Sequence, residues 1–179
     1  MDSQPFSFWL LPGDAERTQL AQLIRDLAAR HGSRPFAPHV TIYGGVHTPQ
    51  DDLPEILRQV VRGLGPMALR VRGLDCTDQF FKSLFIDLAE HPALTLLSQR
   101  VRAALARPVD YQLQPHLSLI YADLPAADKR RIIDSLSLDL EEIRFDEVAL
   151  VTPADPARGW HDIEGWQFPW RCRLDDASA

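Results

Sequence analysis

The chain has 179 residues, of which 45% are hydrophobic and 25% charged, a composition that excludes disordered and fibrous proteins. Its 25 acidic residues outnumber its 19 basic residues, and the net charge of -6 argues against a protein that wraps a long nucleic-acid backbone. The apolar runs are too short to cross a bilayer and no signal-peptide pattern follows Met1, so we expect no membrane span and a cytoplasmic location.

Apolar patterning predicts strands and helices along most of the chain. Leu20, Ile24 and Leu27 recur at helical spacing, and Asp14 is the expected N-cap of their helix. Strands are predicted where apolar residues alternate or cluster between prolines and glycines. The predicted strands are residues 5–11, 36–43, 67–75, 80–88, 116–121, 143–152 and 163–174. The predicted helices are residues 14–31, 50–64, 92–106 and 125–136.

Two segments of the chain repeat the same order of helix, strand and helix. The units are 14–31, 36–43 and 50–64 in the first segment, and 92–106, 113–121 and 125–136 in the second. Their central strands carry Pro38-His39-Val40-Thr41 and Pro115-His116-Leu117-Ser118. Two copies are too few for a solenoid. The repeat therefore predicts one domain over residues 1–179 that is made of two similar lobes facing each other.

Each central strand presents an imidazole beside a hydroxyl. Residues i and i+2 of a strand point to the same face, so His39 projects with Thr41 and His116 with Ser118. A single motif of this kind is usually structural. Two copies in matched contexts favour a functional cleft that holds two imidazoles and two hydroxyls.

This set of groups suits the hydrolysis of a phosphodiester. A neutral histidine can take a proton from the attacking water, while a protonated one gives a proton to the departing oxygen. The Thr41 and Ser118 hydroxyls can donate hydrogen bonds to the phosphate oxygens. The scheme needs no metal or cofactor, and no cluster of metal-binding residue types stands at ligand spacing in the sequence. Which histidine is acid and which is base stays open at this stage.

The paired motifs resemble the His-x-[Thr/Ser]-x signatures of the 2H phosphoesterase superfamily, and more closely its cyclic phosphodiesterase branch. Further matching segments begin at Ser7, Phe36 and Phe80, so the resemblance covers most of the chain. It implies an α+β fold in which two antiparallel sheets with outer helices form a bilobal, pseudo-symmetric structure around a central cleft. It also implies metal-independent hydrolysis of ADP-ribose 1″,2″-cyclic phosphate or of nucleoside 2′,3′-cyclic phosphates to the 2′-phosphate.

The resemblance also assigns roles to individual side chains. His39 and His116 become the catalytic pair, and Thr41 and Ser118 become the phosphate binders. Three aromatic residues are expected to contact the substrate, with core packing as the alternative role for Trp9 and Phe81. They are Tyr121, which lines the site of the family, and Trp9 and Phe81, which would pack on the ribose or base. Independently, Trp160 and Trp166 flank a stretch that could form a loop over the site.

Two other functions stay open. One is an enzyme that acts on RNA 2′,3′-cyclic phosphate ends or 2′–5′ linkages, although the acidic net charge speaks against the basic channel it would need. The other is a non-catalytic module that binds phosphorylated ligands or RNA ends. We expect a monomer whose partner is a small cyclic-phosphate nucleotide. Cys76 and Cys172 are predicted to be reduced thiols, with a single disulfide between them left open.

Overall fold

The structure, a computed structural model, describes residues 3–105 and 111–174. Its strands are β1 (Gln4–Pro12), β2 (Val40–His47), β3 (Met67–Cys76), β4 (Leu84–Leu88), β5 (His116–Ile120), β6 (Glu142–Pro153) and β7 (Trp166–Arg173). Its α-helices are α1 (Asp14–His31), α2 (Leu53–Val61), α3 (Pro92–Leu105) and α4 (Ala126–Ser135). Short 3-10 turns are η1 (Phe80–Lys82), η2 (Gly159–His161) and η3 (Ile163–Gly165).

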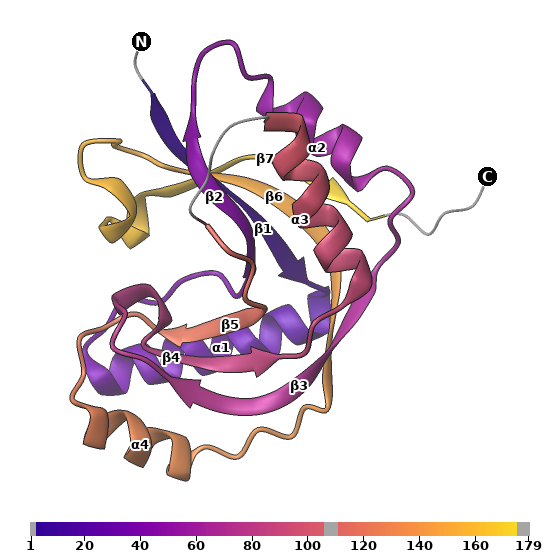
Figure 1. Ribbon diagram of the computed structural model, residues 1–179. Coiled ribbons are helices and arrows are strands. Elements are labelled where there is room, and N and C mark those ends of the chain that lie inside the picture. The colour runs from indigo at the N-terminus through magenta and orange to yellow at the C-terminus, as the bar shows by residue number, and fades with distance from the viewer. Residues whose placement is uncertain (1–2, 106–110, 175–179) are drawn as a thin grey trace.

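All strand pairs are antiparallel, and the strands form two sheets that share one long strand. The order is β2-β1-β6-β3-β4-β5, with β7 pairing to β6. The first part of β3, from Met67 to Arg70, pairs with β6, whereas its later part, from Val71 to Cys76, pairs with β4. The sheets therefore meet at β3, and the helices lie outside them (Figure 1). The expectation of an α+β fold with two antiparallel sheets and outer helices is confirmed.

The internal repeat is longer than the sequence indicated, and its two copies exchange strands. The copies are β1-α1-β2-α2-β3 and β4-α3-β5-α4-β6. The last strand of each copy pairs with strands of the other copy, because β3 pairs with β4 and β6 of the second copy and β6 pairs with β1 and β3 of the first. Helices α1 and α3 also contact the opposite copy, at β5 and β2 respectively. The exchange ties the halves together; that residues 1–179 form one domain remains a prediction.

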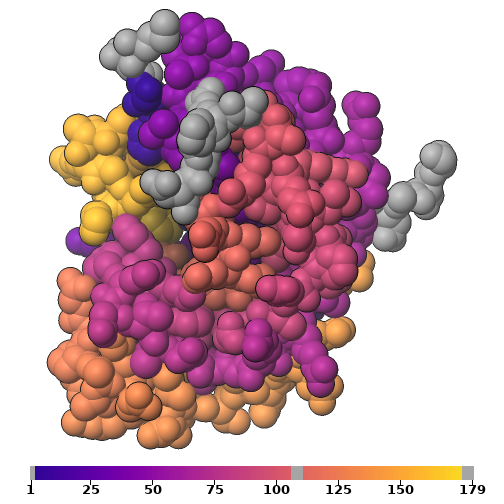
Figure 2. Space-filling model, in the orientation of Figure 1, coloured from indigo at the N-terminus to yellow at the C-terminus, as the bar shows by residue number. Residues whose placement is uncertain are grey.

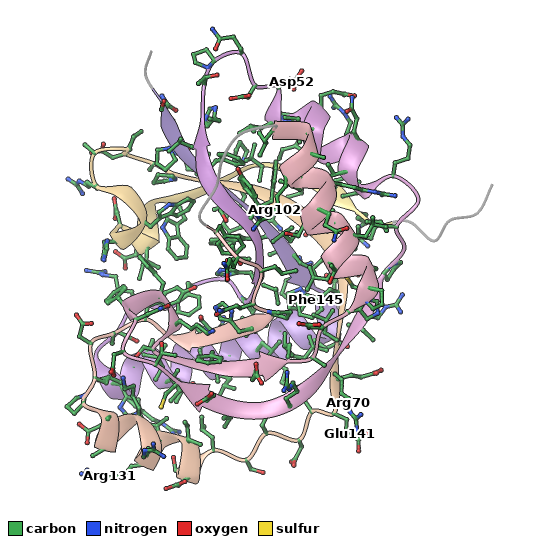
Figure 3. All side chains as sticks on the ribbon, in the orientation of Figure 1. Asp52, Arg70, Arg102, Arg131, Glu141 and Phe145 are labelled. Atoms are coloured by element: carbon green, nitrogen blue, oxygen red, sulfur yellow. The ribbon has the colours of Figure 1, made fainter. Side chains whose placement is uncertain are left out.

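The core lies between the sheets and their helices. Helix α1 buries Leu20, Ile24 and Leu27, the residues whose spacing predicted it. Phe145 of β6, labelled in Figure 3, is fully buried near the centre of the molecule. In the part of the chain that the structure describes, no helix is long and apolar enough to span a bilayer. Cys76 and Cys172 are not joined by a disulfide.

Several predicted boundaries are wrong for local reasons. The strand predicted over 36–43 begins only at Val40 and continues through Gly44-Gly45 to His47, because β1 pairs with it along this whole length. The strands predicted over 80–88 and 163–174 each begin with a 3-10 turn. Helix α1 has Gly13, not Asp14, at its N-cap position. The last residue of the helix predicted over 92–106 lies outside the described residues.

Candidate active site

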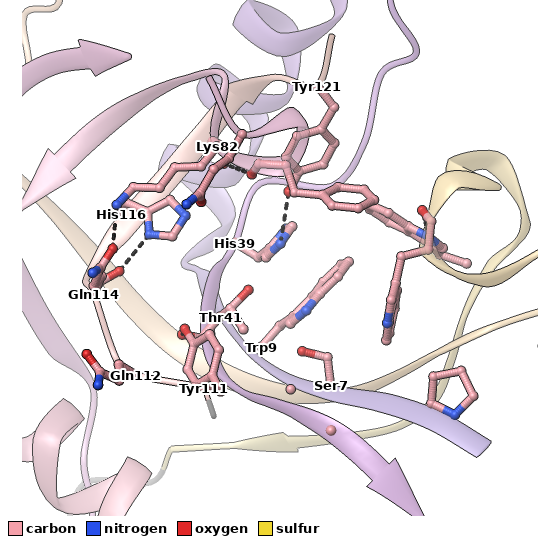
Figure 4. Close-up of a pocket in the computed structure, with 18 of the residues that line it drawn as sticks. Ser7, Trp9, His39, Thr41, Lys82, Tyr111, Gln112, Gln114, His116 and Tyr121 are labelled. Carbon is pink, nitrogen blue, oxygen red and sulfur yellow. Dashed lines mark hydrogen bonds between the residues drawn. The ribbon is translucent and has the colours of Figure 1, made fainter. Parts of the chain in front are cut away.

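A cleft with a volume of about 780 Å³ opens between the two halves of the molecule. Figure 2 shows the surface hollowed where the yellow C-terminal part meets the magenta and orange parts of the chain. All seven residues that the sequence selected line this cleft: Trp9, His39, Thr41, Phe81, His116, Ser118 and Tyr121. The structure thus brings together residues that lie far apart in the sequence (Figure 4).

A β-bulge decides which side chains of β1 and β2 face the cleft. Phe8 pairs with Tyr43 but Trp9 pairs with Thr41, so the register shifts by one residue between the two pairs. The shift lets Ile42 and Tyr43 both enter the core, while Thr41 and Gly44 line the cleft. Simple alternation from His39 would have put Tyr43 in the cleft. Bulges of this kind commonly re-aim side chains beside active sites.

His39 is held in one orientation from two sides. Its Nδ1 lies 2.7 Å from the carbonyl oxygen of Ala37, which can only accept, so the proton of the neutral ring sits on Nδ1. The Trp9 indole stacks on the imidazole with ring centroids 3.5 Å apart and planes 4° apart. Only 5% of His39 is exposed, and this burial lowers its pKa to about 3, although the bond to Ala37 opposes the shift. His39 is therefore neutral at pH 7.

The Nε2 atom of His39 faces the second half of the molecule. The Tyr121 hydroxyl lies 3.4 Å from it, and this long contact joins the two copies of the repeat. Burial raises the pKa of Tyr121, so the phenol keeps its proton and donates it toward Nε2. Tyr121 also stacks on Phe36, with ring centroids 3.8 Å apart.

His116 repeats the arrangement of His39 on the opposite wall. Its Nδ1 lies 2.6 Å from the carbonyl oxygen of Gln114, again the residue two positions earlier. Burial lowers the pKa of His116, the bond to Gln114 raises it, the positive charge of Lys82 lowers it, and the charge of Asp87 raises it. Each histidine thus uses Nδ1 for a backbone carbonyl and keeps Nε2 for chemistry.

The two hydroxyls differ in their surroundings. Ser118 is buried and its Oγ donates to the carbonyl oxygen of Phe81 at 2.9 Å. It must exchange this bond before it can donate to a phosphate. Thr41 is half-buried and points toward the centre of the cleft (Figure 4). Its carbonyl oxygen accepts a bond of 2.7 Å from the Tyr111 hydroxyl.

The aromatic residues form a continuous cluster on one side of the cleft. Trp9 is buried against His39 and packs edge-on against Trp166 at 5.1 Å. Phe81 packs edge-on against Tyr121 at 5.3 Å. Trp160 and Trp166, expected on a loop over the site, both line the cleft, and the indole of Trp166 donates to the Trp160 carbonyl. The segment from Trp160 to Trp166 therefore forms part of the cleft wall.

Several polar residues that line the cleft were not selected from the sequence, among them Ser7, Lys82, Tyr111 and Gln114. Lys82 donates to the side-chain oxygen of Gln114 at 2.7 Å and is the cation beside His116. Ser7 stands two residues before Trp9, so the strand period that placed His39 with Thr41 would have found it. Tyr111 and Gln114 lie in the segment before β5, which has no such period to reveal them.

Within residues 3–105 and 111–174, no group of three or more His, Cys, Asp or Glu side chains is arranged to hold a metal ion. The cleft therefore offers imidazoles, hydroxyls, one lysine and several aromatic rings. Metal independence itself stays a prediction.

Comparisons with known proteins bear on this site and fold. A family model described as "Cyclic phosphodiesterase-like protein" matches residues 5–161. The chain is 24% identical over 176 residues to the cyclic phosphodiesterase of Arabidopsis thaliana, covering 95% of each. Among solved structures, E. coli LigT in apo form has a TM-score of 0.65 at 15% identity, covering 98% of this chain and 99% of that one. E. coli LigT complexed with 3′-AMP has a TM-score of 0.62 at 16% identity, covering 97% and 99%. The solved structures thus share the fold over nearly the whole chain.

Proposed function

Because this chain belongs to the cyclic phosphodiesterase-like family of the 2H phosphoesterase superfamily, we propose that it hydrolyses small nucleoside 2′,3′-cyclic or ADP-ribose 1″,2″-cyclic phosphates by two-histidine acid/base catalysis. Membership of this family makes the chain an enzyme. The substrate class and the mechanism are the parts that we propose.

The observation that carries the mechanism is the matched anchoring of the two imidazoles. Nδ1 of His39 and Nδ1 of His116 each bond the carbonyl of the residue two positions earlier, and both rings line one cleft. A fixed tautomer leaves one Nε2 on each wall to move a proton. Binding alone needs no acid and base pair, so the presence of both imidazoles favours catalysis over a module that only binds phosphate.

We assign the base to His39 and the acid to His116. Burial keeps His39 neutral at pH 7, so its Nε2 can accept the proton of the attacking water. A bound phosphate anion favours the protonated imidazole, which raises its pKa toward the range in which a general base works well. His116 is less buried, so a bound phosphate anion can more readily restore its proton. Its Nε2 then gives that proton to the oxygen that leaves phosphorus. The ring opens, and the family resemblance implies that the 3′ oxygen leaves and a 2′-phosphate remains.

The negative charge of the phosphate needs donors that are already in place. Thr41 and Ser118 supply hydroxyls from the two walls, and Lys82 supplies a cation on the side of His116. Charge builds on the non-bridging oxygens as water attacks, so these donors stabilise the transition state more than the ground state. The aromatic cluster of Trp160, Trp166 and Phe81 offers flat surfaces for the sugar or base.

The cleft volume of about 780 Å³ lies within the range of pockets for small organic ligands. E. coli LigT, which shares the fold, has been crystallised with 3′-AMP, ATP and NADP⁺. These observations support a small nucleotide as the substrate. An RNA end is the competing substrate, and the experiment below separates the two. The expected monomeric state and cytoplasmic location stay predictions.

The test is a comparison of substrates with the purified protein. It is incubated with a 2′,3′-cyclic mononucleotide and, separately, with an RNA oligomer ending in a 2′,3′-cyclic phosphate, and the products are separated by chromatography. We expect rapid turnover of the mononucleotide to its 2′-phosphate. Preferred turnover of the oligomer would assign an RNA-end enzyme. Turnover of neither would leave a binding module and refute the proposal.

The His39→Ala variant shows whether any turnover belongs to this cleft. His31→Ala is the matched control, because His31 ends α1 and does not line the cleft. The control should keep the wild-type rate.

A further inference from the structure

We propose that Lys129 of α4 is a positioning residue for one wall of the active-site cleft. That wall carries Phe81 and Lys82, and Gln114 connects it to His116. Lys129 itself is buried and does not line the cleft. The inference rests on the proposed function for its catalytic readout, but its structural readout does not. Figure 1 shows α4 beyond β3, on the side away from β1 and β2.

Lys129 ties down the first residues of the segment between β3 and β4. Its side chain is only 3% exposed. Nζ donates to the carbonyl oxygen of Thr77 at 2.6 Å and to Oδ1 of Asp78 at 2.9 Å. The Asp78 carboxylate is 98% exposed, so this ion pair is screened by water. The shorter, part-buried bond to the Thr77 carbonyl is therefore the main restraint.

From Thr77 the restraint passes along the segment to the cleft wall. The Thr77 hydroxyl donates to the carbonyl oxygen of Lys82, and the Thr77 amide donates to the carbonyl oxygen of Ser83 at 3.2 Å. These two bonds join Thr77, which precedes the 3-10 turn η1, to the end of that turn. The turn presents the Phe81 ring to the cleft, and the Phe81 carbonyl accepts the bond from Ser118.

The same turn reaches His116 in two further bonds. Lys82 Nζ donates to the side-chain oxygen of Gln114 at 2.7 Å, and the Gln114 carbonyl accepts from Nδ1 of His116 at 2.6 Å. An unbroken set of contacts thus runs from α4 to the proposed general acid. Figure 4 shows the last two bonds.

The burial of Lys129 is what makes this arrangement informative. Lysines are almost never fully buried unless paired, because removing an ammonium from water is costly. An apolar side chain on α4 would pack against β3 without that cost. The lysine instead places its charge where it satisfies a loop carbonyl, so the restraint on the loop is the contribution that an apolar side chain could not make.

The test removes the ammonium and measures both chemistry and the state of His116. Lys129→Met keeps the length of the side chain and deletes its donors. We expect kcat/KM to fall by roughly 10- to 100-fold, as for a displaced catalytic group, with the circular dichroism spectrum unchanged. The charge of Lys82 lowers the pKa of His116, so releasing the turn should raise the pKa seen in the NMR titration of that imidazole. Asp87 and His39 are the other titratable neighbours, and neither lies on the released turn.

Four further variants make the test specific. Lys82→Met should raise the pKa of His116 by a similar amount, and the Lys82→Met/Lys129→Met double variant should show little more than either alone. Arg131→Met is the control, because Arg131 lies on the same helix, points outward and pairs only with Asp128 among the described residues (Figure 3). It should change neither readout. Thr77→Val interrupts the same contacts one step nearer the cleft, and it replaces Lys129→Met if that variant does not fold.

The results separate two kinds of failure. If the wild-type protein turns over no cyclic phosphate, the proposed function fails, but the NMR titration still tests the positioning of His116. If Lys129→Met or Thr77→Val folds normally and leaves both kcat/KM and the His116 titration unchanged, the positioning role is refuted. A fall in kcat/KM that Arg131→Met reproduces would also refute it, since the effect would then come from general weakening of α4.

Discussion

The burial of His39 predicts that this residue destabilises the folded protein in acid. An unfolded chain exposes the imidazole to water, where its pKa takes the ordinary value of 6.5, whereas burial in the cleft lowers the pKa to about 3. The unfolded state therefore binds a proton between these two values and the folded state does not. As the pH falls below 6.5, protonation draws the equilibrium toward the unfolded chain.

The size of the effect follows from the two pKa values. At pH 7 neither state binds a proton at His39, so this contribution to stability is fully present. At pH 4.5 the solution is two pH units below the pKa of the imidazole in the unfolded chain. Protonation of that imidazole lowers the free energy of unfolding by about 3 kcal/mol. That is a large part of the roughly 5–15 kcal/mol by which a domain of this kind is folded. Removing the imidazole should remove this part of the pH dependence.

The assay is urea unfolding of wild type and of His39→Gln at pH 7 and pH 4.5, followed by tryptophan fluorescence. Carboxylates contribute equally to both proteins, so the difference between the two pH dependences isolates His39. Between pH 7 and pH 4.5, the free energy of unfolding should fall by about 3 kcal/mol less in His39→Gln than in wild type. His116→Gln should show a smaller change of the same sign, because burial lowers that pKa too but leaves more of the ring exposed. Equal losses in wild type and His39→Gln would refute the reasoning.

Three further predictions concern the reaction. His39→Ala and His116→Ala should each lower the rate by roughly 10²–10⁴-fold, and the double variant should be little worse than the poorer single one; multiplying losses would contradict paired proton transfer. Because burial lowers both histidine pKa values in the free enzyme, the plot of kcat/KM against pH should be bell-shaped, with its alkaline limb below pH 6.5. A bound phosphate anion should shift the alkaline limb of the kcat profile to higher pH. A maximum of kcat/KM above pH 8 would contradict this. Hydrolysis should persist in excess EDTA, because imidazoles and hydroxyls supply the chemistry; loss of activity that a divalent metal restores would overturn the mechanism.

The residues that we propose as the catalytic and phosphate-binding groups were selected from the sequence because they repeat. His39 with Thr41 and His116 with Ser118 recur in matched surroundings, and the period of a strand alone puts each pair on one face. The period failed two residues further on, where the bulge between Phe8 and Trp9 changes the register. Nothing local marks that bulge, since it depends on how β1 and β2 pair.

Residues that act through tertiary contacts could not be found in the sequence. Trp9 was expected to pack on the substrate or in the core, and its stacking on His39, a contact made across paired strands, was not foreseen. Nothing in the sequence marks Lys129, because its burial depends on a loop some fifty positions earlier. The tie from Lys82 to Gln114 likewise joins residues that lie 32 positions apart. Such contacts exist only in the folded protein, where segments far apart in the sequence lie side by side.

The exchange of β3 and β6 between the two copies has a consequence for how the chain folds and how it can be divided. Strand β1 pairs with β6, so the first strand to be synthesised waits for nearly the last before its sheet is complete. Pairings so distant in sequence slow folding, since a long loop must close before they form. A chain cut between β3 and β4 would separate β1 from β6 and would leave β3 without either of its partners, β4 and β6. The two pieces should therefore fold only on meeting, each completing the sheet of the other, so that a split version of this protein would be a reporter of proximity and not a pair of independent lobes.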